Sequence, residues 1–352
     1  MKVLFFIEKA NGFFISMIDF MESFFPEYEK EYIVIDRRNE FDFKKLKNTT
    51  QITEYSQFWL DKKVREKFFV AEKIIVSGVF VSPFALLAFP KKVLQKCIYQ
   101  FWGGDYTCFR EETIKNSFIK ILTERCVNNA KAIVNLTEGE KKEFTRYFTV
   151  AKRFFFVPVP AGPEHREINK KYRIKAKTAV FNRKRIIIGN SATESNNHLE
   201  IFDRLANKEW AGYEIVCPLS YGSKVYADRV IEKGKKIFGD SFFPITEFMP
   251  FVDYLELLLS CSVGIYDHNR QQGLGNAYLI LNMGKKLYLR RNSESWVYHS
   301  SFGAVLNDSA DLAKQSIEEI FRWDNQKTQA NYVAIDREEM NMLSVWNDIL
   351  VL

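Results

Sequence analysis

The sequence predicts an α/β protein made of two domains, each built around a parallel β-sheet. Short β-branched or aromatic runs alternate with longer amphipathic stretches along most of the chain, which is the pattern of strand–helix repeats. The pattern breaks between residues 158 and 185, where prolines and a glycine precede a run of lysines and arginines. With 352 residues, of which 47% are hydrophobic, the chain can form two packed cores.

Six strands and four helices are expected in the first half. The apolar runs predict strands at residues 3–7, 32–35, 73–77, 93–99, 132–136 and 154–157. The amphipathic stretches predict helices at residues 13–24, 57–68, 111–128 and 138–148. We therefore expect an N-terminal Rossmann-like domain at residues 1–163.

The second half repeats this organisation after a basic linker at residues 164–184. Strands are expected at residues 185–188, 214–216, 242–244, 263–266 and 286–289. They predict a second Rossmann-like domain at residues 185–335, and a ligand is expected in the cleft between the domains. Residues 336–352 have a helical pattern and are expected to pack back on the first domain.

Composition favours an anionic partner and argues against several other classes. Lys and Arg outnumber Asp and Glu by 51 to 44, a net charge of +7, but the basic residues are dispersed and no nucleic-acid-binding motif is present. The five cysteines are scattered without C-x-x-C spacing, so neither a disulfide framework nor a metal site is expected. The first apolar run is too short for a signal peptide and no membrane span is predicted, so we expect a cytoplasmic protein.

A first candidate site follows the apolar run at residues 186–188. Backbone N–H groups at a helix start can hold a diphosphate or its sugar, with polar side chains as further donors. The alternative is that Ser195 or Asn196 simply caps the helix. The residues proposed for binding are Gly189, Asn190, Ser191, Ser195, Asn196 and His198.

A second and more specific candidate follows the run at residues 263–266. Arg270, Gln271 and Gln272 precede Gly273 and Gly275 at a strand-to-helix turn. Arginine offers a fixed fork for phosphate oxygens, and glutamines can bind sugar hydroxyls. A solvated loop explains Arg270 but explains the whole cluster less well.

Two tyrosines are further candidates for the binding site. Tyr221 and Tyr254 could line a pocket for the base or the sugar, or they could be core residues with a hydrated hydroxyl.

The first domain holds a candidate catalytic base. Trp102, Gly103, Gly104 and Asp105 follow the strand expected to end at residue 99. A carboxylate at the end of a strand can take a proton from an attacking hydroxyl, if it lies within hydrogen-bond reach. The alternative is a tight turn in which Asp105 caps the next helix.

Two clusters of basic and aromatic residues, at 62–69 and 141–148, suit docking on an anionic bilayer. The alternative, which each cluster taken singly favours, is an amphipathic helix whose phenylalanines point inward.

These segments together resemble the bacterial transferases that add 4-acetamido-4,6-dideoxygalactose from a dTDP donor to a lipid-linked saccharide in enterobacterial common antigen assembly. The resemblance covers most of the second domain and patches of the first. It rests on the two candidate loops, and on Arg291 with Trp296, Trp102 with Asp105, and Thr137 with Gly139.

This resemblance implies a GT-B glycosyltransferase: two facing Rossmann-like domains, with the donor bound by the second, the acceptor by the first, and no metal. It implies that Asp105 is the base, that Trp102, Gly103, Gly104 and Thr137 lie on the acceptor side, and that Arg291 is donor-binding. It also implies transfer of a deoxyamino sugar in surface polysaccharide synthesis, by a peripheral protein on the inner face of the cytoplasmic membrane.

The sequence departs from the family at Ser77-Gly78 and at Val159-Pro160, both in the acceptor half. Two alternatives therefore stay open. One is the same fold with another nucleotide-sugar donor or a non-lipid acceptor, and the other is a non-catalytic nucleotide-sugar-binding protein.

Overall fold

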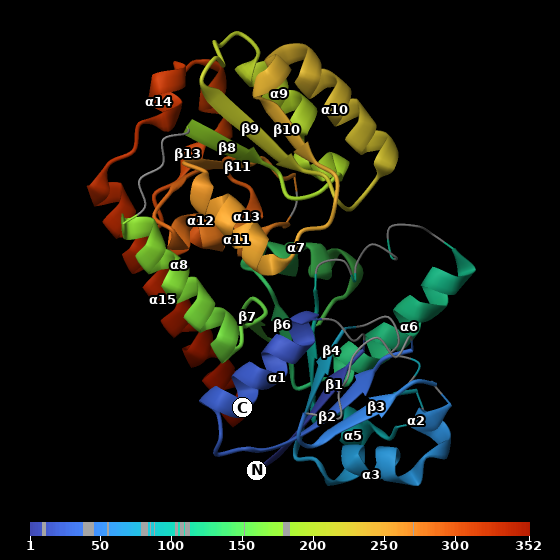
Figure 1. Cartoon of the computed structure of the whole chain (residues 1–352). Coiled ribbons are helices and arrows are strands. Elements are labelled where there is room, and N and C mark those ends of the chain that lie inside the picture. The colour runs from blue at the N-terminus through green and yellow to red at the C-terminus, as the bar shows by residue number, and fades with distance from the viewer. Residues whose placement is uncertain are drawn as a thin grey trace. The chain divides into compact units, whose positions relative to one another are not determined.

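Parallel β-sheets form the centre of both halves of the chain, as the alternating sequence pattern predicts (Figure 1). The structure, a computed structural model, describes all residues except 9–11, 38–45, 55, 79–83, 85, 88, 103–104, 106–108, 110–112, 151, 179–183 and 270. Of residues 12 and 13 it describes the backbone alone. The chain divides into unit 1, Met1–Arg166 with Asn341–Leu352, and unit 2, Glu167–Met340.

The described part of unit 1 contains a seven-stranded sheet in which all neighbouring strands are parallel. In spatial order its strands are β3 (Thr49–Ile52), β2 (Glu29–Ile35), β1 (Lys2–Ile7), β4 (Lys73–Ser77), β5 (Cys97–Gln100), β6 (Ala132–Asn135) and β7 (Arg153–Phe156). The order of the chain reverses between β1 and β4. Loops after these two strands therefore diverge to opposite faces, which opens a binding position at the carboxyl edge of such sheets.

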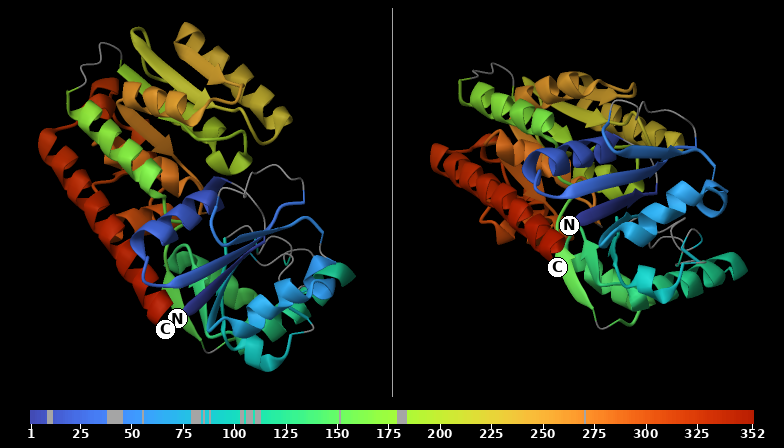
Figure 2. Two further views of the ribbon diagram at one scale, coloured as in Figure 1. Left: turned by 60° about the horizontal axis from the view of Figure 1, so that its bottom comes forward. Right: turned by 90° about the horizontal axis from the view of Figure 1, so that it is seen from below.

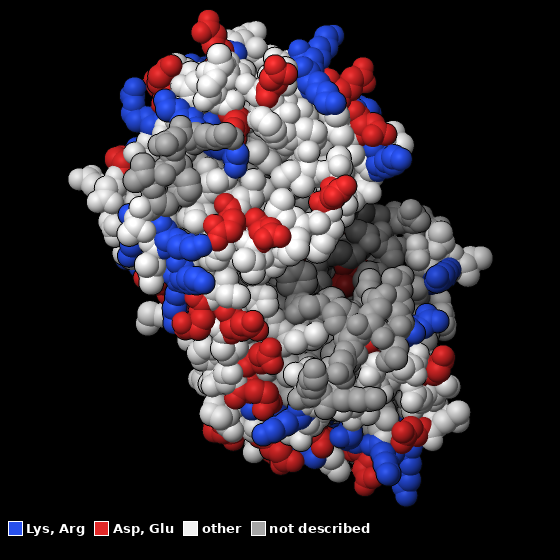
Figure 3. Space-filling view, viewed as in Figure 1, with Lys and Arg blue, Asp and Glu red and all other residues white. Residues whose placement is uncertain are grey.

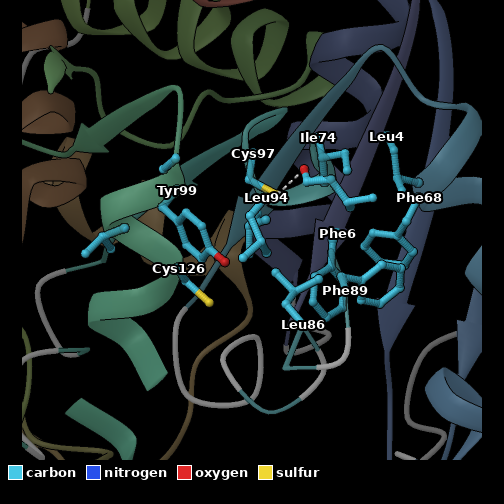
Figure 4. Packing of buried hydrophobic residues seen from close by; sticks show 14 of the residues in the cluster. Leu4, Phe6, Phe68, Ile74, Leu86, Phe89, Leu94, Cys97, Tyr99 and Cys126 are labelled. Carbon is cyan, nitrogen blue, oxygen red and sulfur yellow. Dashed lines mark hydrogen bonds between the residues drawn. The ribbon is translucent and has the colours of Figure 1, made fainter. Parts of the chain in front are cut away.

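Helices cover both faces of this sheet because successive side chains of each strand point to opposite sides (Figures 1 and 2). One face packs against α2 (Gln57–Leu60), α3 (Lys62–Val70), α5 (Lys91–Leu94), α6 (Ile114–Asn129) and α7 (Glu138–Tyr147). Figure 4 shows this core, in which the rings of Phe6 and Phe68 are 5.7 Å apart. The other face packs against α1 (Gly12–Phe24) and the end of α15 (Asn325–Val351).

Three local predictions in unit 1 are wrong. Residues 91–94 form α5 rather than the start of a strand, because Pro90 has an extended conformation that starts a helix. The helix expected at residues 57–68 is divided at Asp61, whose carboxylate accepts hydrogen bonds from the backbone of Lys63 and Val64 and so begins α3. The edge strand β3 was not predicted, because its sequence TTQI lacks an apolar run.

Unit 2 contains, in its described part, a six-stranded sheet that is also parallel throughout. Its spatial order is β10 (Phe242–Ile245), β9 (Tyr213–Pro218), β8 (Lys184–Ile188), β11 (Val263–Tyr266), β12 (Lys286–Leu289) and β13 (Asn307–Asp308). Here the chain order reverses between β8 and β11. The two candidate loops of the second half therefore follow neighbouring strands at the same sheet edge.

Both faces of this second sheet are covered as well. One face packs against α9 (His198–Leu205), α10 (Lys224–Phe238), η5 (Ser309–Ala313) and α14 (Ile317–Phe321). The other packs against α8 (Pro163–Thr178), α11 (Phe251–Ser260), α12 (Leu274–Asn282), α13 (Glu294–Ser301) and the first part of α15. Two short 3₁₀ turns, η3 (Glu194–Asn196) and η4 (Gly239–Ser241), complete the described elements.

The chain passes between the two units through helices rather than through an irregular linker. Most of the segment predicted as a basic linker is α8, whose Tyr172 is buried in the core of unit 2. Lys170, Lys171 and Lys177 are exposed on its outer face, whereas Arg173 points inward and donates hydrogen bonds to Asn282 and Asp336. The last turns of α15 belong to unit 1, where Trp346 is fully buried and Lys73 donates a hydrogen bond to the carbonyl of Ile349.

Candidate functional site

The loop after β8 is held in a conformation that requires glycine. Gly189 has a φ of +69°, and a Cβ there would lie 2.2 Å from Nε2 of His198 and 2.9 Å from Oδ1 of Asn196. No side chain fits so close to the imidazole and the amide, and this backbone region itself disfavours L-residues. The glycine thus brings the chain against two buried polar side chains at the carboxyl edge of the sheet.

Asn196 links the two candidate loops. Its Oδ1 accepts hydrogen bonds from the backbone N–H of Asn190 and from Nε2 of His268, both at 3.0 Å. Its Nδ2 donates to Oγ1 of Thr193 at 2.7 Å and to Oγ of Ser191 at 3.1 Å. Asn196 is only 1% exposed, so these protein groups replace water as its partners. This residue does not cap α9, and its role is to hold the loops.

Gln272 makes a second link between the loops. Its Oε1 accepts a hydrogen bond from Oγ of Ser195 at 2.6 Å. Its Nε2 donates to Oγ1 of Thr193 at 3.2 Å and to Oγ of Ser191 at 3.3 Å, and it lies 3.5 Å from Oδ1 of Asn190. The expected proximity of the two loops is therefore observed, although Arg270 lies outside the described residues. We call Asn190, Ser191, Thr193, Ser195, Asn196, His268 and Gln272 the loop cluster.

The loop cluster combines hydroxyl, amide and backbone groups at one sheet edge. Such groups can both donate to phosphate oxygens and exchange hydrogen bonds with sugar hydroxyls. Gln271 is half-buried, and no described residue forms a hydrogen bond with its amide, which leaves that amide available to a ligand.

The second loop also depends on a glycine. Gly273 has a φ of +69°, and a Cβ there would lie 2.7 Å from Cε1 of His268. At Gly275 a Cβ would meet nothing within 4 Å, so the surrounding protein does not demand a glycine at that position.

His198 and His268 are both buried, at 0% and 1% exposed. Burial, together with the neighbouring His268, lowers the pKa of His198 to about 3. His198 is therefore neutral near pH 7, and its Nδ1 lies 3.4 Å from Oη of Tyr226. His198 packs against Gly189 in the loop after β8 and carries no charge that a ligand could contact.

The two candidate tyrosines have different positions. Tyr221 is 56% exposed, and its Oη accepts a hydrogen bond from Nδ2 of Asn190 at 3.1 Å, so it extends the loop cluster. Burial raises its pKa. Tyr254 is half-buried on α11 and donates to Oδ1 of Asn276 at 2.9 Å, so it joins α11 to α12 instead.

Of the two arginines that follow β12, the candidate Arg291 makes no ion pair with a described residue, whereas Arg290 does. Arg291 is exposed, and its described contact is with the ring of Trp296, 5.9 Å from Cζ to the ring centroid. Its neighbour Arg290 instead donates from Nη2 to Oδ2 of Asp267 at 2.6 Å and to Oε2 of Glu200 at 2.8 Å.

Asp267, whose side chain is fully buried, directly follows β11, and it also accepts a hydrogen bond from Ser309. This ion-pair network fixes the base of the second loop. Sequence reasoning missed Thr193, Asp267 and Arg290 as site-forming residues. The position of Asp267 directly after a buried strand was the available signal.

In unit 1 Asp105 is buried, at 4% exposed, and its Oδ2 accepts a hydrogen bond from the backbone N–H of Trp102 at 2.7 Å. Burial raises the pKa of Asp105 to about 7, and the Trp102 N–H opposes this only in part. Thr113, not Asp105, caps α6. A carboxyl group with a pKa near neutrality can act as a general base at physiological pH.

The other predicted acceptor-side residues lie at the same sheet edge where they are described. Trp102 contacts Phe14 with ring centroids 4.8 Å apart, and Thr137 is buried at the start of α7. Gly103 and Gly104 lie outside the described residues. Sequence reasoning missed a buried pair at this edge: Oγ of Ser77 donates to Oε1 of Gln100 at 2.6 Å, across neighbouring strands β4 and β5.

The two clusters proposed for membrane docking are largely core-forming. Phe68, Phe144 and Phe148 are buried in the core of unit 1, so the interpretation with inward-pointing phenylalanines is the correct one for them. No described helix has both the length and the apolar character needed to cross a bilayer.

Charge and metal-ligating side chains give two further observations. Lys and Arg are interspersed with Asp and Glu on the face shown in Figure 3, rather than gathered into one basic stripe. Within the described ranges no group of three or more His, Cys, Asp or Glu side chains is arranged to hold a metal ion.

Several solved structures have a similar fold. An E. coli trehalose-6-phosphate structure bound with UDP-2-fluoro glucose matches with a TM-score of 0.67, 10% identity, and 100% and 98% of the two chains covered. Anabaena HepE in complex with UDP and glucose matches with a TM-score of 0.62, 12% identity, and 99% and 98% covered. The N-terminal domain of Candida albicans trehalose-6-phosphate phosphatase matches with a TM-score of 0.66, 12% identity, and 99% and 95% covered.

The protein has the GT-B glycosyltransferase fold, as expected from the sequence. Residues 33–351 match glycosyl transferase group 56, described as 4-alpha-L-fucosyltransferase, and the chain belongs to this family. The protein is therefore a glycosyltransferase, and the non-catalytic alternative is not supported.

Proposed function

We propose that this glycosyltransferase moves a deoxyamino sugar from a dTDP-linked donor to a polyprenyl-diphosphate-linked saccharide in bacterial surface polysaccharide synthesis. The observation that carries the donor assignment is the loop cluster, in which Gln272 joins Asn190, Ser191 and Ser195 at the point where strand order reverses. Open α/β sheets bind their ligands at this position. The family description names fucose, a 6-deoxyhexose, which supports a 6-deoxy sugar as the transferred group.

In this proposal the donor diphosphate binds at the loop after β8. The backbone N–H groups beyond Gly189, the amide of Asn190 and the hydroxyl of Ser191 donate to its oxygens. Gln271 and Gln272 bind hydroxyl or acetamido groups of the sugar, and Tyr221 borders the nucleoside. Arg270 and Arg291 neutralise the leaving diphosphate, so the reaction needs no divalent cation.

Asp105 serves as the general base toward the acceptor. As the acceptor hydroxyl attacks the anomeric carbon of the donor, its proton passes to the Asp105 carboxylate and the dTDP group leaves with the bonding electron pair. The raised pKa of about 7 makes this carboxylate basic enough to accept the proton while part of the population stays ionised near pH 7. The acceptor is proposed to be lipid-linked, which places the enzyme peripherally on the inner face of the cytoplasmic membrane.

A nucleotide screen tests the donor assignment. A ligand that binds only the native state raises the melting temperature, and the rise grows with the logarithm of the ligand concentration divided by its Kd. We expect dTDP and dTDP-sugars to raise it more than UDP, GDP or ADP compounds at equal concentration. Because E. coli and Anabaena proteins of this fold are bound to UDP compounds, a larger shift with UDP would replace dTDP in the proposal.

A transfer assay tests the lipid-linked acceptor and the independence of a divalent cation. Nucleotide sugars are paired with lipid-linked and free saccharide acceptors, with EDTA or added Mg²⁺ in parallel reactions. We expect turnover with the lipid-linked acceptor that is unchanged by EDTA. Transfer to free saccharides alone would reject the lipid-linked acceptor, and loss of turnover in EDTA would reject a metal-independent reaction.

A further inference from the structure

Buried polar side chains line the carboxyl edge of the sheet in unit 1. Five neighbouring strands, β2, β1, β4, β5 and β6, each end in such a residue or are followed directly by one. These residues are Asp36, Glu8, Ser77, Gln100 and Asn135, none of which is more than 6% exposed. Burial of polar groups costs free energy unless they form hydrogen bonds, so a layer of them at a ligand-binding edge fits a polar ligand.

Ser77 and Gln100 form the centre of this polar edge. They lie directly opposite each other on β4 and β5, and Oγ of Ser77 donates a hydrogen bond to Oε1 of Gln100 at 2.6 Å. The backbone is fixed at the same level, because Gly78 N–H donates to the carbonyl of Gln100 at 3.1 Å. The amide of Gln100 is thus held in one orientation, beside the point where the chain order reverses between β1 and β4.

Two side-chain N–H donors at this edge have no acceptor. Nε2 of Gln100 and Nε1 of Trp102 are covered from solvent, and neither forms a hydrogen bond with a described residue. Both lie on the side of the sheet that packs against α1, because Gln100 follows Ile98 by two positions and Trp102 packs against the same core. An unpaired buried donor lowers stability, so a native protein keeps one where another molecule completes the hydrogen bond.

The chemistry of the two donors defines what completes them. A group that pairs with N–H donors must be a hydrogen-bond acceptor, such as a hydroxyl, carbonyl or phosphate oxygen. Neither donor carries a charge, and the carboxyl groups of Glu8 and Asp105 are buried at the same edge, which disfavours a phosphate. A hydroxyl or acetamido oxygen of a saccharide fits both conditions.

Trp102 relates this pair of donors to the proposed general base. Its backbone N–H donates to Oδ2 of Asp105 at 2.7 Å, so the residue that carries one free donor also holds the base. We propose that Nε2 of Gln100, oriented by Ser77, donates to a hydroxyl or acetamido oxygen of the acceptor saccharide and thereby selects which saccharide is accepted. This inference rests on the proposed function for its saccharide acceptor and adds the residue that determines acceptor specificity.

Steady-state kinetics test the assignment of Gln100. The probes are farnesyl-diphosphate-linked hexoses and N-acetylhexosamines, offered as acceptors to the full-length protein. Gln100→Met keeps the length of the side chain and removes its N–H groups, so we expect kcat/KM for the acceptor to fall about tenfold or more. Hydrolysis of the nucleotide sugar by water, measured without acceptor, is expected to change by less than about twofold. An equal fall in both rates would place the effect on the donor or on Asp105 and overturn the proposal.

Deoxy acceptors identify the oxygen that Gln100 contacts. Each probe is also prepared with single hydroxyl or acetamido groups replaced by hydrogen. In the unchanged protein we expect one of these analogues to lose about tenfold in kcat/KM. In Gln100→Met that loss is expected to disappear, because both changes remove the same hydrogen bond. If the two losses multiply for every analogue, Gln100 contacts no saccharide oxygen and the proposal is wrong.

The alternative is that a buried water completes Nε2 of Gln100 and that the pair only stabilises the fold. Ser77→Ala with Gln100→Met replaces both partners by apolar groups, which is nearly neutral or stabilising. We therefore expect this double variant to unfold in urea at the same midpoint as the unchanged protein or a higher one, and to lose acceptor kcat/KM like Gln100→Met. A lower midpoint with unchanged acceptor kcat/KM would assign a structural role and overturn the proposal.

The matched control is Gln95→Met, at an exposed glutamine just before the other end of β5. It is expected to change neither transfer nor hydrolysis, and a loss equal to that of Gln100→Met would overturn the proposal.

Failure of this inference can be distinguished from failure of the proposed function. If no saccharide accepts a sugar from any donor, the proposed function is wrong and the acceptor assignment of Gln100 is wrong with it. If transfer occurs and Gln100→Met transfers like the unchanged protein, only the assignment of Gln100 is wrong. Transfer to free saccharides alone corrects the lipid-linked part of the proposed function, and the same variants are then compared with those acceptors.

Discussion

Nε2 of His268 lies 3.0 Å from Oδ1 of Asn196, and this hydrogen bond joins two loops whose residues are 72 positions apart. The same oxygen accepts the backbone N–H of Asn190 at 3.0 Å. Because Asn196 is almost fully buried, water cannot readily replace either partner. The backbone that is proposed to receive the donor diphosphate is thus positioned by a single buried amide.

Asn196→Ala is expected to destabilise the protein and weaken donor binding. The substitution leaves two buried donors without an acceptor, which costs about 3 kcal/mol of unfolding free energy. Urea denaturation measures the loss, and nucleotide titration measures the affinity. Asn207→Ala, at an exposed position without a hydrogen bond among the described residues, is the control and is expected to change neither. An Asn196→Ala protein with unchanged nucleotide affinity would show that the loop does not bind the donor.

Two glycine substitutions are expected to change the free energy of unfolding in opposite directions. Gly189→Ala places a Cβ against His198 in a positive-φ conformation and is expected to cost about 3 kcal/mol or more. Gly275→Ala meets no atom within 4 Å and lies in α12, so it is expected to stabilise by about 0.5 to 1 kcal/mol. If a ligand approaches Gly275, the same change lowers nucleotide affinity. Unchanged affinity would remove Gly275 from the donor site.

The pH dependence of turnover is expected to follow Asp105. As a general base it must be ionised, so kcat/KM should rise with pH and level off above an apparent pKa near 7. Asp105→Asn should lower kcat by about 10² to 10⁴-fold, remove this titration, and leave donor affinity intact. A variant that keeps the same pH profile and turnover would assign the base to another residue.

Asp105 should also affect the pH dependence of stability. Its pKa is raised from 3.8 to about 7 by burial, so the folded state binds more protons than the unfolded state between these values. The resulting stabilisation is fully present below pH 4 and is lost as pH rises through 7. We expect the unfolding free energy of the unchanged protein, measured relative to Asp105→Asn, to fall by on the order of 4 kcal/mol across this range. If the difference in unfolding free energy between the two proteins stays constant over this pH range, the pKa of Asp105 is not raised.

Two neighbouring arginines provide a matched pair of variants. Arg290→Gln removes the guanidinium that forms an ion pair with the buried carboxylate of Asp267. We expect it to lower the free energy of unfolding by about 3 kcal/mol. Arg291→Gln, at an exposed side chain that contacts Trp296, is expected to change stability by less than about 0.5 kcal/mol. If Arg291 binds the donor diphosphate, its variant still loses nucleotide affinity. Normal affinity in Arg291→Gln would exclude it from the site.

Most of the architecture was predictable because strand burial leaves a local signal. The runs at residues 186–188 and 263–266 are continuous and apolar, so their assignment as buried parallel strands is confirmed. Elements without such a signal were missed, as with the edge strand β3. Where apolar residues also suited a helix, as at Val93 and Leu94, the strand prediction failed.

The sequence by itself determined that two parallel sheets form and that glycine and amide side chains follow particular strands. It did so because apolar runs and turn residues reflect local conformational preferences. Only the tertiary structure decided that β8 lies beside β11, which brings Asn196 to His268 and Gln272 to Ser195. It likewise decided which face of α6 is buried and which is exposed. Partners that are 70 or more residues apart are fixed by strand order, and strand order is set by the packing of the whole sheet rather than by any local segment.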